Sequence, residues 1–127
     1  MRTLRFVACL IGSIVIAASR ADALDFPVGH SSVADAQITR LMMDEAYPQI
    51  VFLQLSDAPD ENAECHRNST WHYAIPISSP EGQNMYSALL ALKASAGHAF
   101  FGGADECVTE LPPEILGIER LARLELH

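Results

Sequence analysis

Residues 78–97 read SSPEGQNMYSALLALKASAG and hold the strongest helix pattern in the chain. Ser78 and Glu81 have the spacing of a capping box, and Pro80 favours the φ angle of a first helical turn. Apolar side chains then recur at helical spacing, and Gly97 suits a left-handed C-terminal cap. The stretch predicts a helix of about 17 residues, roughly 25 Å long, between groups of short strands.

Short segments with strand patterns lie on both sides of this helix. Residues 49–55 are apolar at both alternating sets of positions and predict a strand that is buried on both faces. Residues 71–78 alternate clearly, and Pro76 indicates an edge or a bulge near the end of that strand. Residues 98–101 predict a short strand that ends at Gly102-Gly103.

Two segments fit both helical and strand periods, and the strand is favoured in each: residues 37–43 within 33–43, and residues 116–126. The predicted order is then strand, strand, strand, helix, strand, strand. One helix between the third and fourth of five strands is the order of an OB-type barrel. The fold prediction is a mainly β domain with one central helix, built as a five-stranded OB-like Greek-key barrel.

The N-terminal residues have the pattern of a secretory signal peptide. Arg2 and Arg5 precede a short apolar run over residues 6–18, and Ala21-Asp22-Ala23 is a small-x-small cleavage pattern. The predicted division is a signal peptide at 1–23, a flexible leader at 24–32 and a single domain at 33–127. The protein is therefore expected to be exported, to the periplasm or the medium, without a membrane span after cleavage.

The exported part of the chain is strongly acidic. Removing residues 1–23 from the 127 leaves 104, with five basic and 15 acidic side chains and a net charge of −10 when the histidines are neutral. Such a charge repels nucleic acid and anionic membranes, so both are excluded as expected partners. A glycan, a protein partner or a second copy of the chain remain as alternatives.

Cysteine usage favours one disulfide bond. Cys9 belongs to the predicted signal peptide, so Cys65 and Cys107 remain in the exported domain. Two cysteines in a small exported domain most simply pair with each other, and two free thiols or a shared metal are the alternatives. In the chain-entropy model, closing a loop of about 43 residues stabilises the fold by roughly 4 kcal/mol.

Several motifs together resemble a broad group of small exported bacterial proteins in which paired cysteines bracket a helix. The motifs are Cys65, Trp71-x-Tyr73, the helix with Tyr86-Ser87-Ala88-Leu89-Leu90 and Gly97, then Gly102-Gly103 and Cys107. The layout is also similar to the OB-fold B subunits of subtilase-type and typhoid-type toxins, which form pentamers and bind sialylated glycans. The resemblance, over residues 49–126, implies an OB fold, but no glycan-binding residue carries over because the first strand lacks a hydroxyl-rich match.

Two surfaces are candidates for contacts with other molecules. Trp71 and Tyr73 would form an aromatic ligand platform if their strand exposed them, although alternating aromatic residues more often belong to a core. The small-residue side of the predicted helix is a candidate subunit contact, because a bare helix face lets another chain approach closely; the alternative is an ordinary solvent face. Its residues are Ser87, Ala88, Ala91, Ala94 and Ser95.

The sequence does not point to catalysis or to a cofactor. His66, His72 and His98 lack the spacing of metal ligands, so no metal is expected. Ser87 and Ser95 lie within the predicted helix, without the local signature of a catalytic nucleophile. The function prediction is a small exported, non-enzymatic binding or accessory domain. The alternatives are a glycan-binding, ring-forming B subunit of a toxin-like complex and a small secreted hydrolase.

Overall fold

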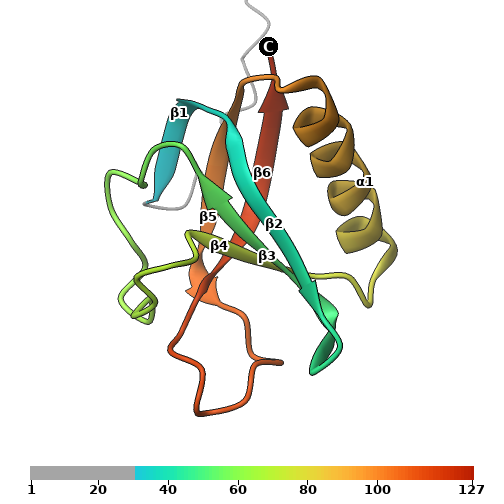
Figure 1. The fold of residues 1–127 in the computed structure, drawn as a ribbon. Helices are drawn as coiled ribbons and strands as arrows, with labels where there is room; N and C mark the ends of the chain where they lie inside the picture. Colours follow the sequence, from blue (N-terminus) through green and yellow to red (C-terminus); the bar gives the residue numbers. More distant parts are fainter. Residues whose placement is uncertain (1–30) are drawn as a thin grey trace, which may run out of the picture.

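The computed structural model describes residues 31–127, which form a mainly β domain with one helix and a six-stranded sheet (Figure 1). The predicted signal peptide, residues 1–23, and the predicted leader up to residue 30 lie outside the described residues. Within residues 31–127, no helix is long and apolar enough to cross a membrane. The elements are β1 (Ser32–Ala36), β2 (Ile38–Asp44), β3 (Tyr47–Leu55), β4 (Tyr73–Pro76), α1 (Pro80–Ser95), β5 (Ala99–Cys107) and β6 (Glu119–Leu126).

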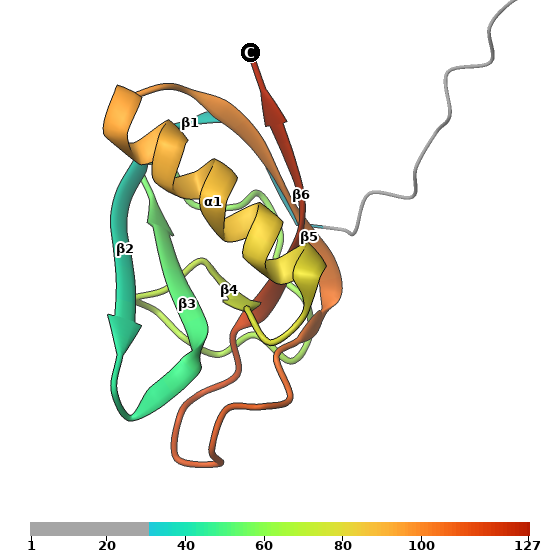
Figure 2. The same ribbon diagram turned by 90° about the vertical axis from the view of Figure 1, so that its right-hand side faces the viewer.

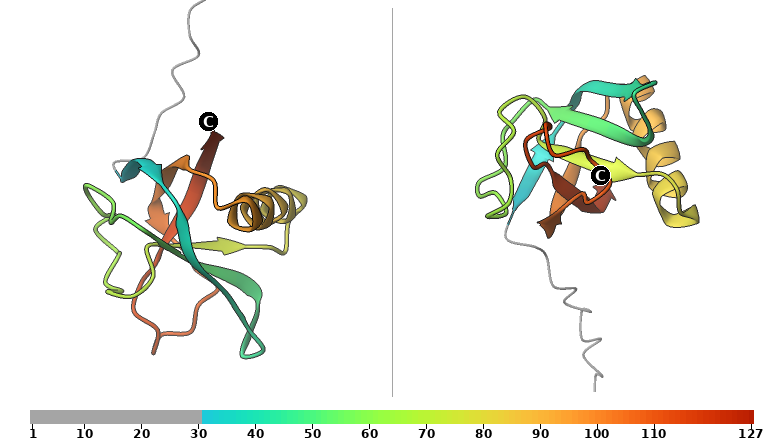
Figure 3. Two further views of the ribbon diagram at one scale, coloured as in Figure 1. Left: turned by 45° about the horizontal axis from the view of Figure 1, so that its top comes forward. Right: turned by 90° about the horizontal axis from the view of Figure 1, so that it is seen from below.

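The strand order in the sheet is β1-β5-β6-β4-β3-β2. Neighbouring strands are antiparallel except β4 and β6, which are parallel and pair through Ala74 and Arg120. β1 and β2 stand at opposite ends of this order, although Gln37 alone separates them along the chain. A single run of chain therefore joins the two ends of the sheet, which curves back toward its first strand (Figure 3).

α1 covers one side of the curved sheet (Figure 2). Its side chains Leu89 and Leu92 are buried in the main apolar cluster, which also contains residues from all six strands. Lys93 Nζ donates hydrogen bonds to the carbonyl oxygens of Ile38 and Thr39, both at 3.0 Å, and so attaches the end of the helix to β2. The apolar stripe that predicts the helix is thus the surface that closes the main core.

A second apolar cluster lies on the other face of β3 and β4. It is formed by Ile50, Phe52, Trp71, Ala74, Val108 and Ile118, with Leu111 and Ile115 packed against it. Val51 and Leu53 belong to the main cluster instead, which confirms that β3 is buried on both faces. The segment between β5 and β6 therefore covers the outer face of these strands instead of extending freely into solvent.

The sheet differs from the prediction in the number and the limits of its strands. Six strands are present where five were predicted, because residues 33–36 form part of β1 and pair with β5, and Gln37 interrupts the run before β2. Both ambiguous segments contain strands and no helix. β5 continues through Gly102-Gly103 to Cys107, whereas the prediction ended it at the glycines. Gly103 is needed inside the strand because a β-carbon there would lie 2.1 Å from Glu119 Oε1.

The helix has the predicted length and position but different caps. Ser79, not Ser78, is the N-cap, and its Oγ accepts a hydrogen bond from the Gly82 N–H at 3.1 Å. At the other end Ala96, not Gly97, adopts the left-handed conformation, with φ 50°. Gly97 has a packing role instead, because a β-carbon at this position would lie 2.8 Å from Leu92 Cδ1.

Replacing Ser79 by alanine is expected to lower the free energy of unfolding by about 1 kcal/mol, because the Gly82 N–H loses its acceptor. Chemical denaturation of both variants measures this loss against Ser78→Ala, whose expected effect is within about 0.5 kcal/mol. A larger loss from Ser78→Ala than from Ser79→Ala would place the cap where the sequence predicts it.

Candidate functional site

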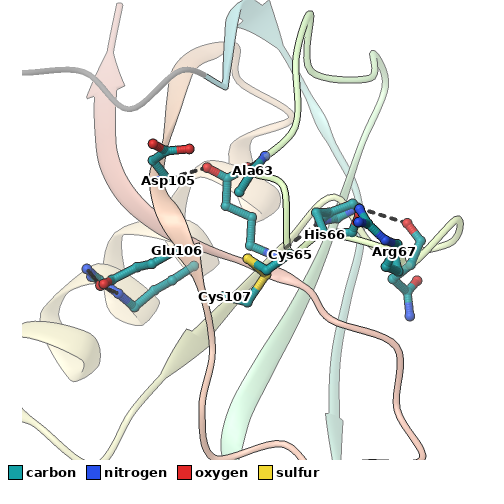
Figure 4. The surroundings of a disulfide bond; sticks show 10 residues. Ala63, Cys65, His66, Arg67, Asp105, Glu106 and Cys107 are labelled. Carbon is teal, nitrogen blue, oxygen red and sulfur yellow. Dashed lines mark hydrogen bonds and ion pairs between the residues drawn. A yellow bond between two sulfur atoms is a disulfide. The ribbon is translucent and has the colours of Figure 1, made fainter.

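The predicted disulfide bond is present. Cys65 and Cys107 are bonded, with 6.0 Å between their α-carbons (Figure 4). The bond joins the long segment between β3 and β4 to the end of β5. An open acidic groove lies beside it, lined in part by Glu61, Glu64, Asp105 and Glu106. The bond therefore fixes the segment against the sheet at a surface rich in negative charge.

A buried carboxylate holds the same segment to β5. The side chain of Glu119 has no exposed surface. Its Oε2 accepts the Ala63 N–H at 3.1 Å and its Oε1 accepts the Asp105 N–H at 3.0 Å (Figure 4). Asp105 has φ 58°, a left-handed conformation that is uncommon outside glycine. Glu119 thus satisfies two backbone donors from separate segments that no regular ladder would pair.

Next to this carboxylate, Tyr73 and Ser31 form a buried polar pair. The Tyr73 and Ser31 hydroxyl oxygens are 2.8 Å apart, and both residues have no exposed surface. Burial raises the pKa of Tyr73 to about 12, and the negative charges of Glu119 and Asp60 add to the rise, which the hydrogen bond to Ser31 opposes. The phenol therefore stays protonated and serves as a structural hydrogen-bonding group in the core.

The three histidines considered as ligands lie in different environments. His66 Nδ1 accepts the Glu119 N–H at 3.1 Å, while His66 Nε2 is 2.8 Å from the carbonyl oxygen of Asn68. His72 Nδ1 accepts the Leu55 N–H at 3.1 Å. His98 is exposed and contacts Asp35. In residues 31–127, no group of three or more His, Cys, Asp or Glu side chains is arranged to hold a metal ion.

Trp71 and Tyr73 do not form a shared exposed platform. Tyr73 lies in the main cluster and Trp71 in the second one, because β4 starts only at Tyr73 and Trp71 precedes it. Trp71 keeps 9 % of its surface exposed, and the Arg40 guanidinium lies over its ring, with Cζ 4.8 Å from the ring centroid. Phe52 packs behind the indole, with the ring centroids 5.7 Å apart. Trp71 is thus a largely buried indole between the Arg40 guanidinium and the Phe52 ring.

Arg40 is the functional candidate that sequence reasoning missed. It is exposed, and among the described residues it makes no hydrogen bond or ion pair. Arg123 also lies over an aromatic ring, that of Phe100, but it is paired with Glu125. A guanidinium stacked through its face keeps its N–H donors at the edge. Arg40 therefore offers donors to another molecule beside an apolar ring, whereas Arg123 uses them within the chain.

The small-residue side of α1 faces solvent in large part. Ser87, Ala91, Ala94 and Ser95 are exposed, and Ala88 is half-buried. The Ser87 and Ser95 hydroxyls donate to helix carbonyl oxygens, those of Gln83 and Leu92. These five residues therefore lie on an accessible, uncharged surface, and both hydroxyls already have partners within the helix.

Comparison with known proteins identified no similar protein. No protein-family model matches the chain, and neither a curated protein nor a solved structure matches it.

Proposed function

We propose that this protein is a small exported binding domain that acts without catalysis and is built on an OB-like barrel. Three features of the topology support the barrel: β1 and β2 act as one bent strand, β4 and β6 are parallel, and α1 lies between β4 and β5. Five strands in this order with one helix are the arrangement of an OB-type barrel. The disulfide bond and the predicted signal peptide support export, because such bonds persist in oxidising compartments.

The observation that carries the binding proposal is the contact between Arg40 and Trp71. The Arg40 side chain is exposed over a largely buried indole, and residues 31–127 use none of its N–H donors. A saccharide suits this surface, because its hydroxyl oxygens can accept hydrogen bonds from the edge of the guanidinium. Saccharides are therefore the first ligand class to test.

Trp71 is the only tryptophan in the chain, so intrinsic fluorescence reports directly on this surface. Titration with soluble neutral and acidic oligosaccharides is expected to change the Trp71 emission for at least one member of the series. Arg40→Ala should then weaken that binding by about tenfold or more, since hydrogen bonds from a charged donor each contribute on the order of 1.5–3 kcal/mol.

Arg123→Ala is the matched control, because it also removes an arginine that covers an aromatic ring. Its affinity for the same oligosaccharide should equal that of the unmodified protein. Equal weakening by both substitutions would indicate a general charge effect and would exclude a site at Arg40. Binding seen by calorimetry without any change in Trp71 emission would move the site elsewhere on the domain.

A further inference from the structure

Two imidazole rings are among the groups that attach the segment between β3 and β4, residues 56–72, to the domain. His66 Nδ1 accepts the N–H of Glu119 at the start of β6, and His72 Nδ1 accepts the N–H of Leu55 at the end of β3. A backbone N–H can only donate, so both Nδ1 atoms must be unprotonated. His66 then carries its proton on Nε2 and donates it to the Asn68 carbonyl oxygen, at 2.8 Å. Both rings are therefore held in the neutral form.

Protonation makes each of these contacts impossible as it stands. An imidazolium carries a proton on both nitrogens, so Nδ1–H would point at a backbone N–H and two donors would face each other. The ring or the backbone has to move. Because His66 and His72 attach the same segment at two places, protonation of both loosens it at these two places, beside β6 and β3. The disulfide bond does not depend on pH in this way and continues to hold Cys65 to Cys107.

We propose that residues 56–72 form an acid-loosened flap: protonation of His66 and His72 breaks their contacts with β6 and β3, while the Cys65–Cys107 bond, Glu119 and the backbone hydrogen bonds keep the flap on the domain. The device would let an exported protein respond to an acidic compartment without unfolding. The flap contains Trp71, which lies under Arg40, and its Ala63 N–H is bonded to the buried Glu119, so its loosening changes the surface next to Arg40.

The charge of His66 opposes the protonation of His72, and the Arg67 guanidinium, bonded to the His66 carbonyl oxygen, adds positive charge to the segment. The other titratable groups of the segment and of the strands around it are Asp60 and Glu64 of the segment, Asp105 and Glu106 of β5, and Glu119 of β6; Tyr73 of β4 stays neutral, and Arg120 is paired with Glu106. Five backbone hydrogen bonds do not titrate and continue to hold the segment: they run from Ser56 to Gln37, from Asp60 to Ser32, from Arg67 and Asn68 to Gly117, and from His72 to Leu53.

The direction of the pH effect follows from His72. Burial, and then the charge of His66, lowers the pKa of His72 below its ordinary value of 6.5. The attached form thus binds a proton less readily than the loosened form. Attachment is at full strength above about pH 6.5 and weakens as the pH falls through the lowered pKa of the attached form. The flap is therefore attached through both rings at neutral pH and loosened at these two places in acid.

Hydrogen exchange of the oxidised protein tests the proposal directly. The probes are the two N–H groups that donate to the rings, those of Leu55 and Glu119, measured by NMR at about pH 7.5 and about pH 5. After correction for the intrinsic pH dependence of exchange, both are expected to exchange about tenfold faster or more at the lower pH, while the other amides of the β5–β6 ladder keep their protection.

The double variant His66→Asn/His72→Asn is the matched control. An asparagine Oδ1 can accept the same backbone N–H but does not titrate, so the acid response should disappear. His98→Asn should leave it unchanged, because His98 is exposed on another part of the surface.

Three results would overturn the proposal: equal protection of Leu55 and Glu119 at both pH values, an acid response that persists in the double variant, or loss of protection over the whole sheet at the same pH. If the double variant does not fold, the first and third results still decide the question with the unmodified protein.

Discussion

Replacing both Cys65 and Cys107 by serine is expected to lower the free energy of unfolding by about 4 kcal/mol. The bond joins residues separated by 42 positions, and a closed loop of this size removes much conformational entropy from the unfolded chain. For a small domain this is a large part of the total stability, which is on the order of 5–15 kcal/mol. Urea denaturation of the oxidised protein and of the double variant measures the loss.

The reduced form of the unmodified protein is the control for the chemistry of the substitution. Reduction and the double serine variant should destabilise the domain by the same amount, because both remove only the cross-link. A loss below about 1 kcal/mol in both would mean that Glu119 and the backbone bonds already restrain residues 56–72, and that the bond adds little.

Local patterns allowed most of the elements to be predicted. The helix follows from apolar spacing within one stretch, and the double-sided burial of β3 follows from its composition. β1 could not be found this way, because Val33 gains its place by pairing with Phe101, far along the chain. The adjacent serines 78 and 79 both suit an N-cap, and only the path of the chain before α1 selects Ser79.

The parts of the candidate site differ in how well they could be predicted from the sequence. The disulfide bond could be predicted because only two cysteines follow the predicted signal peptide, which leaves few alternatives to a bond between them. Arg40 could not be predicted as a candidate site residue. Its candidacy depends on its position over Trp71, and these two residues come together only in the folded chain. Whether the domain binds a glycan, a protein or a second copy of itself stays a prediction.

Glu119 shows most clearly why some residues of the candidate site could not be predicted from the sequence. Fourteen other carboxylates follow the predicted signal peptide and have the pattern of solvated charge, and composition does not separate this one from them. Its burial depends on backbone donors at Ala63 and Asp105, which are 56 and 14 residues away. One local signal was present: glycine inside a strand often marks a close approach, and Gly103 faces this carboxylate.

Glu119→Ala is expected to destabilise the domain by about 2–5 kcal/mol, because it leaves the N–H groups of Ala63 and Asp105 without an acceptor. Ala63 is 2 % exposed, so water cannot easily replace the lost bond there. Thermal and urea denaturation measure the effect. Glu125→Ala on the same strand is the matched control; its carboxylate is partly exposed, and the expected change is within about 0.5 kcal/mol.

A double-mutant cycle with Gly103→Ala tests the contact itself. Alone, Gly103→Ala should be destabilising, because the new β-carbon would lie 2.1 Å from Glu119 Oε1 and 2.4 Å from Ser31 Oγ. With Glu119 also replaced by alanine, the closest of these clashes is gone, so the double variant should lose less than the sum of the single losses, by about 1 kcal/mol or more. Additive losses would show that the two residues act independently, and that the carboxylate does not occupy the space above Gly103.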